Sequence, residues 1–448
     1  MSDDGLHFLV NVTGAGYHRA AWLDPGVAPG SFIDVDYYQG VAETAERGLF
    51  DALLLPDIPQ QNAGIATAPT QSLEPTLLCA ALAVTTERVG FVPTLSTSFN
   101  RPYNLARRVL SLDHASNGRV GWNVVTTAAP GAAANFGQEV LAREDRYRRA
   151  AEFVHLANRL WDGWEDGALV GDQESGEFAD PAKIHPAAHH GEFFAVEGPL
   201  NVPRSPQGRP VIVQAGASDP GIRFAATAAE VVYGAQLSLP GAVEFGREIR
   251  AMAAAHSRDP GQIRFLPALV PVVAPTEQEA EERWEQLQSR LPPGPTVAAR
   301  LEAALWLRPG ILGGDVDSPL APEIFTRSLA LHEGFPRAAA RFAAETGYSA
   351  REFARHISGG HRLVIGSAQQ VADHIEEWWR AGAVDGFTIA PPALAHDLQS
   401  FVDLVVPELQ RRGIYRDRYP GRTLRANLGL PVPANTFAPF ATLADTAK

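Results

Sequence analysis

The fold of this chain is decided by one stretch of sequence, Ser116-Asn117-Gly118-Arg119-Val120-Gly121-Trp122-Asn123-Val124-Val125-Thr126-Thr127. Asn117-Gly118 favours a turn, because both residue types tolerate a positive φ. Residues 119–125 are rich in β-branched and aromatic side chains, which predicts a central strand. Asn123, Thr126 and Thr127 then place hydrogen-bonding groups at the carboxyl end of that strand. In a parallel α/β protein, ligands bind at that end.

On either side of this stretch, short apolar segments alternate with longer segments of helical periodicity. Strands are predicted at residues 6–12, 50–56, 89–95, 119–125, 210–215, 231–234, 263–273 and 387–390. The helices between them include residues 35–47, 75–88, 103–115, 145–160 and a helix that begins near residue 220. Eight strands separated by helices predict an α/β fold of the (β/α)8 TIM-barrel type. A doubly wound sheet is the alternative, but Gly14-Ala15-Gly16 after the first strand lacks the third glycine of a GxGxxG motif.

Two segments are too long to be simple connections of a barrel. Residues 163–209 are rich in glycine, proline, histidine and acidic residues, and we expect an excursion before the fifth strand. Residues 291–360 hold several short amphipathic pieces, which predicts an insertion between the seventh and eighth strands. Long loops at the catalytic end of a barrel are commonly lids. We therefore expect one barrel domain over residues 1–448, with the second segment as a lid-like insertion.

Composition and charge exclude several classes of partner. The chain has 38 basic and 51 acidic residues, a net charge of −13, and no basic cluster, so we expect no nucleic-acid partner. No apolar stretch approaches the roughly 20 residues of a membrane span, and the N-terminus has no signal-peptide pattern. We expect a cytoplasmic protein with no membrane partner.

The residues for metal-dependent or nucleophilic catalysis are also missing from the sequence. The first predicted strand carries no His-x-His pair, and His189-His190 has no spaced carboxylate partners, so we expect no catalytic metal. There is no Gly-x-Ser-x-Gly elbow. The single cysteine, Cys79, lies in an apolar helical run and is expected to be a buried small hydrophobe.

Several motifs, taken in order along the chain, resemble one known family. They are Gly16-Tyr17-His18, Ser96-Thr97-Ser98-Phe99, the central stretch quoted above, Gln214-Ala215-Gly216-Ala217-Ser218, Asp385-Gly386-Phe387 and Thr423-Leu424-Arg425-Ala426-Asn427-Leu428-Gly429. The chain resembles the flavin-dependent monooxygenases related to nitrilotriacetate monooxygenase component A, dibenzothiophene-sulfone monooxygenase and the large subunit of pristinamycin IIA synthase. This group is a branch of the bacterial-luciferase superfamily. The resemblance covers nearly the whole chain and is specific for the family, but much less so for the substrate.

The resemblance implies that the residues after the second, third and fourth strands contact the ring system of a flavin. Asp57, Thr97 and Asn123 are the residues at these positions. An asparagine amide can both donate and accept hydrogen bonds, which suits the edge of a flavin. The alternatives are structural: Asp57 as a helix cap, and Thr97 as a strand-end hydroxyl bonded to backbone.

A phosphate site is expected on two further segments. Gly216, Ala217 and Ser218 end the fifth strand and open a helix, where small residues and free N–H groups favour an anion. Arg143 and Tyr147 are four residues apart and share a helix face. By resemblance this pair binds the flavin phosphate, with Arg143 at a position where the family usually has histidine. Arginine suits a phosphate as well, although a surface charge is the alternative.

One histidine is a candidate catalytic residue. His18 lies just past the first strand beside Tyr17 and Trp22, where it would place a proton donor near the flavin or the substrate. A structural role is the alternative. His361, which follows Gly359-Gly360, is a weaker candidate.

The resemblance implies an FMNH2-dependent monooxygenase, the large component of a two-component system. A separate NAD(P)H:FMN reductase would supply reduced FMN, and O2 as co-substrate would form a flavin C4a-(hydro)peroxide that oxygenates a small organic substrate. Similar proteins form homodimers or homotetramers. The alternatives are an F420-dependent hydride-transfer oxidoreductase of the same superfamily, a non-catalytic flavin-binding barrel and a metal hydrolase.

Overall fold

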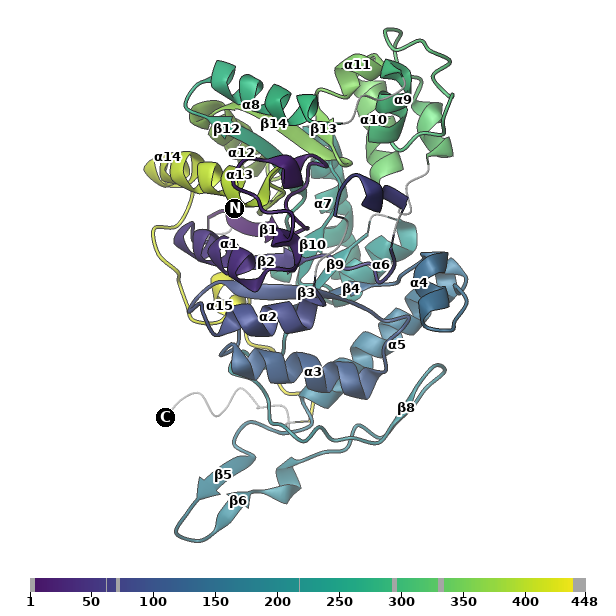
Figure 1. Ribbon diagram of the computed structural model, residues 1–448. Helices are drawn as coiled ribbons and strands as arrows, with labels where there is room; N and C mark the ends of the chain where they lie inside the picture. The colour runs from purple at the N-terminus through teal and green to yellow at the C-terminus, as the bar shows by residue number, and fades with distance from the viewer. Residues whose placement is uncertain are drawn as a thin grey trace.

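The structure is a computed structural model that describes residues 5–61, 63–69, 73–216, 218–291, 296–328 and 334–437. Its centre is a set of parallel strands surrounded by helices (Figure 1). In chain order the central strands are β1 (His7–Asn11), β2 (Ala52–Leu55), β3 (Gly90–Ser96), β4 (Gly121–Val125), β9 (Val211–Ala215), β10 (Val231–Tyr233), β11 (Arg264–Phe265), β12 (Ala268–Ala274) and β15 (Gly386–Ile389). Each is hydrogen-bonded to its neighbours in the order β11-β10-β9-β4-β3-β2-β1-β15-β12.

The two ends of this order are pieces of one chain segment, so the sheet closes into a barrel. β11 pairs with β10 and β12 pairs with β15, and only Leu266 and Pro267 separate them. The Leu266 N–H donates to the Val232 carbonyl on one side, and the Thr388 N–H donates to the Pro267 carbonyl on the other. Proline has no N–H to donate, which explains the interruption. Residues 264–274 are therefore the seventh strand, and the predicted (β/α)8 barrel is confirmed.

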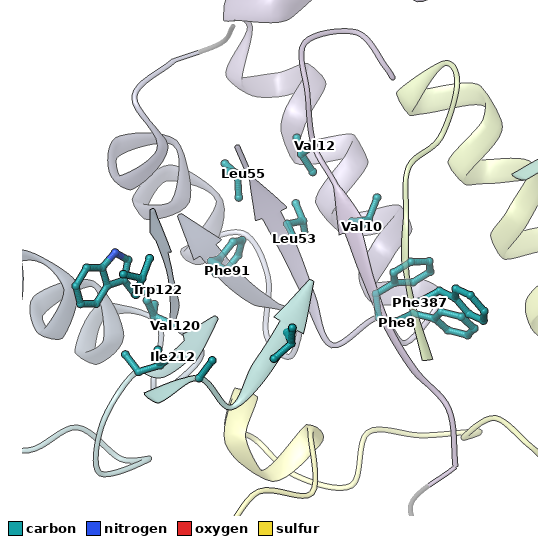
Figure 2. Packing of buried hydrophobic residues seen from close by; sticks show 14 of the residues in the cluster. Phe8, Val10, Val12, Leu53, Leu55, Phe91, Val120, Trp122, Ile212 and Phe387 are labelled. Atoms are coloured by element: carbon teal, nitrogen blue, oxygen red, sulfur yellow. The ribbon is translucent and has the colours of Figure 1, made fainter. Parts of the chain in front are cut away.

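Helices cover the outside of the barrel. They are α1 (Val35–Arg47), α2 (Pro75–Ala83), α3 (Pro102–Ala115), α4 (Pro130–Asn135), α5 (Arg143–Trp161), α6 (Asp219–Ala228), α7 (Leu239–Ala255), α8 (Glu277–Ser289), α12 (Ala368–Arg380), α13 (Leu394–Ser400) and α14 (Val406–Arg411). The main hydrophobic core lies between these helices and the outward-facing strand residues, such as Phe8, Phe91 and Trp122 (Figure 2). Cys79 of α2 belongs to this core as a buried free thiol, as predicted.

A second, smaller core fills the barrel interior near the amino ends of the strands. Inward-facing Leu9, Leu54 and Val213 pack there with Leu424 and Leu428 from the C-terminal segment around α15 (Leu424–Asn427). The amino end of the barrel is thus plugged by apolar side chains. Polar side chains occupy the carboxyl end, where the functional site is expected.

A long strand beside the barrel, β14 (His361–Ser367), was not predicted. It pairs in parallel with β12 from Leu269 to Ala274, and forms a hairpin with β13 (Ile357–Ser358). Its apolar run is only Leu363-Val364-Ile365, flanked by glycines that resemble turn signals. The strand is stabilised by its pairing with β12, and its own sequence has no strong strand signal.

The excursion after α5 forms two small hairpins. They are β5 (Leu169–Asp172) with β6 (Glu177–Ala179), and β7 (His189–His190) with β8 (Ala195–Val196). The β5–β6 hairpin extends away from the barrel (Figure 1). The segment is anchored at its base, where the Asn435 amide donates to the Asp162 carbonyl at 2.9 Å.

The insertion between the seventh and eighth strands has a hydrophobic cluster of its own. It contains α9 (Val297–Ala304), α10 (Gly334–Thr346) and α11 (Ala350–Phe353), and lies beyond β13 (Figure 1). Phe325, Phe335, Phe342 and Phe353 form most of the cluster, which also includes Leu237 from the loop after β10. None of the helices among the described residues combines the length and the hydropathy that crossing a membrane requires.

Candidate functional site

Polar residues follow the strands at the carboxyl end of the barrel. Asn123 lies in the middle of β4, where its amide nitrogen donates to the Thr94 hydroxyl of β3 at 2.8 Å. The Asn123 carbonyl oxygen Oδ1 is buried, and among the described residues no donor reaches it. A buried acceptor without a partner is costly in a native protein, so this atom is available to a ligand N–H group.

Thr97 follows β3, the strand that pairs with β4. Its backbone N–H and its hydroxyl both donate to the Val125 carbonyl, at 3.0 and 3.2 Å. The hydroxyl of Thr97 therefore has the structural role given above as the alternative, because its proton is already donated to the Val125 backbone carbonyl. The lone pairs of that oxygen can still accept a hydrogen bond from a ligand.

Asp57 follows β2, the next strand in the barrel. Burial raises the pKa of its carboxyl group to about 6, and the nearby Glu74 carboxylate adds to the increase. In the described part of the chain no hydrogen-bond donor contacts the Asp57 carboxylate. The Asp57 carboxylate is thus a partly buried acceptor, and it takes up a proton as the pH falls to about 6.

Two hydroxyl groups meet beside the fifth strand. The Tyr147 hydroxyl of α5 lies 3.4 Å from the Ser218 hydroxyl, which caps α6 by accepting from the Gly221 N–H at 3.3 Å. A side chain at Gly221 would have its Cβ 3.1 Å from both hydroxyl oxygens. At Gly216 a Cβ would lie 3.4 Å from the Tyr147 hydroxyl and 2.4 Å from the Gln214 amide nitrogen. The two glycines therefore keep open a small cradle at the N-terminus of α6, where backbone N–H groups favour an anion.

Helix α5, which carries Tyr147, also carries two arginines close to it in sequence. Arg143 is the first residue of the helix and is exposed. Arg146, which the sequence analysis missed, donates to the Thr126 carbonyl at 3.0 Å, and its buried Nε has no partner within the ranges that the structure describes. Burial and the charge of Arg143 lower the pKa of Arg146, while Tyr147 raises it. Among the described residues no carboxylate forms an ion pair with Arg146, so its positive charge is available to an anion.

His18 lies apart from these groups. Its ring packs edge-on against Trp284 of α8 at 5.1 Å, and its Nδ1 accepts from the Ala20 N–H at 3.1 Å. Burial lowers the pKa of His18 to about 4, although Asp397 opposes this effect. His18 is therefore neutral at pH 7 with its proton on Nε2. Its catalytic role stays a prediction.

The structure thus brings together Tyr147, Gly216 and Ser218, and sets Thr97 beside the strand that carries Asn123. Ala217 lies outside the described residues. A second polar cluster consists of Asn11 at the end of β1, Tyr233 at the end of β10 and His361 at the start of β14. Of these three residues, the sequence analysis named only His361 as a candidate. The rule that polar residues end barrel strands would have found Asn11 and Tyr233, whereas no local signal marks Arg146.

The fold and these contacts define a class: a (β/α)8 barrel with a glycine-lined, hydroxyl-bearing cradle at the carboxyl ends of its strands. The chain belongs to the luciferase-like monooxygenase family, whose model matches residues 6–385. Its relatives include nitrilotriacetate monooxygenase component A of Aminobacter aminovorans, which is 40% identical over 97% of this chain and 98% of that protein.

Solved structures agree with this assignment. EDTA monooxygenase from Chelativorans sp. BNC1 has a TM-score of 0.81 and 35% identity over 95% of this chain and 99% of that one. Riboflavin lyase, solved with a modified FMN and riboflavin, also has a TM-score of 0.81, with 31% identity over 96% and 97% of the two chains. The protein is therefore an enzyme of a monooxygenase family.

Proposed function

We propose that this protein is the oxygenating component of a two-component flavin monooxygenase. It binds reduced FMN that a separate NAD(P)H:FMN reductase supplies, and uses O2 to oxygenate a small organic substrate. The observation that carries the proposal is the cradle formed by Tyr147, Ser218 and the two glycines Gly216 and Gly221. A related structure that holds a modified FMN and a relative named as a "component A" support the cofactor and the two-component arrangement.

The residues of the site fit FMN on observations of this chain. The phosphate would occupy the cradle, held by the Tyr147 and Ser218 hydroxyls and by the N-terminus of α6. Arg146 would balance the phosphate charge, and Arg143 is near enough to add to the positive potential. The unpartnered Asn123 Oδ1, Thr97 and the Asp57 carboxylate would face the isoalloxazine ring, whose N–H groups need acceptors.

When bound, reduced FMN supplies the two electrons that activate O2. The residues of this chain hold the flavin, orient it and exclude water. Asp57 is ionised above a pH of about 6 and can hold a flavin N–H by a charge-assisted hydrogen bond. The apolar plug at the amino end of the barrel closes the far side of the site, so ligands enter from the carboxyl end.

The insertion is suited to the role of a lid. It reaches the carboxyl end of the barrel, where Arg337 of α10 pairs with Asp219 of α6 at 3.3 Å. Arg341 of α10 also pairs with Glu244 of α7. Exposed ion pairs of this kind contribute about 0–1 kcal/mol each, so they can separate without a large loss of stability. A closing lid would protect the reduced flavin from water.

The test is to mix the protein anaerobically with reduced FMN and then add O2. We expect tight binding of reduced FMN, a slowed reoxidation of the flavin compared with free FMNH2, and no reaction with NADH in the absence of a reductase. Reduction of a substrate by reduced F420 without O2 would support the hydride-transfer alternative. Binding of FMN with reoxidation as fast as in solution would indicate a non-catalytic flavin-binding barrel.

A further inference from the structure

The second polar cluster is built on strands that the proposed flavin residues do not use, although Tyr233 pairs in register with Ala215, the residue before Gly216. The Thr13 hydroxyl donates to Asn11 Oδ1 at 2.8 Å, and Asn11 Nδ2 donates to the Tyr233 hydroxyl oxygen at 3.3 Å. The Tyr233 hydroxyl in turn lies 3.0 Å from His361 Nε2. The cofactor residues come from β2, β3, β4 and β9, whereas this chain of hydrogen bonds joins β1, β10 and β14.

These hydrogen bonds favour one tautomer of His361. The Tyr233 oxygen accepts from Asn11, and its own hydroxyl proton can be donated to His361 Nε2. A neutral imidazole that accepts at Nε2 carries its own proton on Nδ1. His361 Nδ1 is buried, and none of the described residues bonds to it. The result is a buried N–H donor with no acceptor in the described part of the chain, although native proteins satisfy nearly all such groups.

The backbone before His361 is also held in place. Gly359 and Gly360 have φ angles of +51° and +81°, which favour glycine. The Tyr17 hydroxyl donates to the Gly359 carbonyl at 3.0 Å, and the Tyr17 ring lies 5.4 Å from the His361 ring. A Cβ at Gly359 would be 2.3 Å from the Tyr17 ring. His361 therefore has a fixed position at the border between the insertion and the barrel.

Among the described residues no charged side chain forms a hydrogen bond or an ion pair with the His361 ring, whose aromatic neighbours include Tyr17 and Tyr233. Burial alone lowers the pKa of His361 to about 4, and no charged group contributes. Burial also raises the pKa of Tyr17 and of Tyr233, and again no charged side chain acts on either. A carboxylate bound here would be buried without a cation, which is strongly unfavourable. A carbonyl or sulfonyl oxygen would accept the hydrogen bond at no such cost.

We propose that His361 is a substrate-binding residue that donates its Nδ1–H to an uncharged oxygen acceptor of the substrate. Tyr233 and Asn11 are positioning residues that fix the tautomer. The inference rests on the proposed function, because it takes the bound molecule to be the substrate that is oxygenated. It assigns a substrate class: a compound with a neutral carbonyl or sulfonyl oxygen at the end that meets β14.

The first test is the tautomer, observed by nitrogen-15 NMR of histidine-labelled full-length protein at pH 7. The signal of His361 is assigned by its loss in His361→Gln. We expect Nδ1 to carry the proton in the wild type, and Tyr233→Phe to shift His361 toward the Nε2–H form. Tyr103→Phe, which alters an exposed tyrosine, is the control and leaves the signal unchanged. A wild-type His361 protonated on Nε2 overturns the proposal.

The second test uses two probes of the same shape and different charge, acetophenone and benzoate. We expect acetophenone to shift the His361 Nδ1 signal and to bind at least tenfold more tightly than benzoate. In His361→Gln and Tyr233→Phe its affinity falls several-fold, while the melting temperature shows that both variants are folded. Equal responses to the two probes, or a response to neither, contradict the proposal.

These measurements are made without flavin, and the dissociation constant of reduced FMN is measured separately. Failure of the protein to bind FMN would refute the proposed function and leave the tautomer and probe results standing. If FMN binds normally but acetophenone does not shift the His361 Nδ1 signal, only this inference is refuted.

Discussion

The hydroxyls of Tyr147 and Ser218 lie 3.4 Å apart, although 71 residues separate them in the chain. Tyr147 belongs to the helix that follows the fourth strand, and Ser218 opens the helix that follows the fifth. Their meeting is a consequence of barrel closure, which places successive helices side by side. The sequence predicted that both residues bind the flavin phosphate, and the structure places their hydroxyls in direct contact.

Removing the tyrosine hydroxyl should weaken the binding of FMN and not that of riboflavin. A hydrogen bond to a charged group contributes about 1.5–3 kcal/mol, so Tyr147→Phe should raise the dissociation constant of reduced FMN by roughly 10- to 100-fold. Riboflavin lacks the phosphate, and its affinity should not change. Anaerobic fluorescence titration measures both, with Tyr103→Phe as the matched control. An equal loss for both ligands would place the phosphate elsewhere.

Filling the cradle should have the same effect by a different route. In Gly221→Ala the new methyl group would lie 3.1 Å from both hydroxyl oxygens, where it competes with the phosphate. Gly221 is a helical residue of α6, so alanine is compatible with its backbone and should not lower the melting temperature. We expect at least a tenfold loss of FMN affinity in a stable protein.

A matched glycine shows the effect of alanine alone. Gly40 lies in α1, and a Cβ there would meet nothing within 4 Å. Gly40→Ala should raise stability by about 0.5–1 kcal/mol and leave FMN affinity unchanged. If Gly221→Ala also leaves FMN affinity unchanged, the cradle is not the phosphate site.

Asp57 should make flavin binding depend on pH. Its pKa of about 6 means that the carboxylate is protonated as the pH falls below that value, and a protonated carboxyl is a weaker acceptor. We expect the affinity for reduced FMN to fall through this range in the wild type and less steeply in Asp57→Asn. Titrations of both proteins between pH 5 and 8 separate this effect from the ionisation of FMN itself, which is common to both. Parallel curves would remove Asp57 from the site.

The same carboxyl group should also affect stability, with a definite sign. Because its folded pKa is raised above the ordinary value of 3.8, the folded protein binds more protons than the unfolded chain between pH 4 and 6. The contribution of Asp57 to the free energy of unfolding therefore falls as the pH rises through this window. Asp57→Asn should gain stability relative to the wild type over the same range, as urea denaturation can show.

The plug at the amino end of the barrel should control stability and not cofactor binding. Arg425 is 2% exposed, and its guanidinium pairs with the Glu230 carboxylate, with one contact at 3.1 Å. Arg425→Met would leave this carboxylate without its cation, so we expect a loss of about 3–5 kcal/mol. Arg411→Met, at a position 71% exposed, should lose less than about 1 kcal/mol. A similar small loss for both would mean that the plug is not a stabilising element.

Much of the fold could be predicted because its elements are marked locally. The helix predicted over residues 35–47 has these bounds in the structure, with Asp34 as its cap and Gly48 at its end. The seventh strand was predicted in place, although Pro267 divides it. β14 could not be predicted, because its stability comes from pairing with β12 and not from its own short apolar run.

The candidate site was predictable to a smaller extent. Positions after strands pointed to Asp57, Thr97 and Asn123, and resemblance pointed to Tyr147 and Ser218. Neither signal pointed to Arg146, the neighbour of Tyr147 on α5. Neither showed that the His18 ring packs against Trp284, because sequence position fixes where a backbone lies and not where a side chain turns.

The sequence by itself determined the barrel, the family and the strand ends at which ligands bind, because apolar periodicity, turn residues and short motifs are local properties of a chain. Only the tertiary structure decided which polar atoms are paired. Hydrogen bonds such as those of Asn11, Tyr233 and His361 join residues up to 222 positions apart, and whether one of their atoms is left without a partner depends on the packing of the whole barrel.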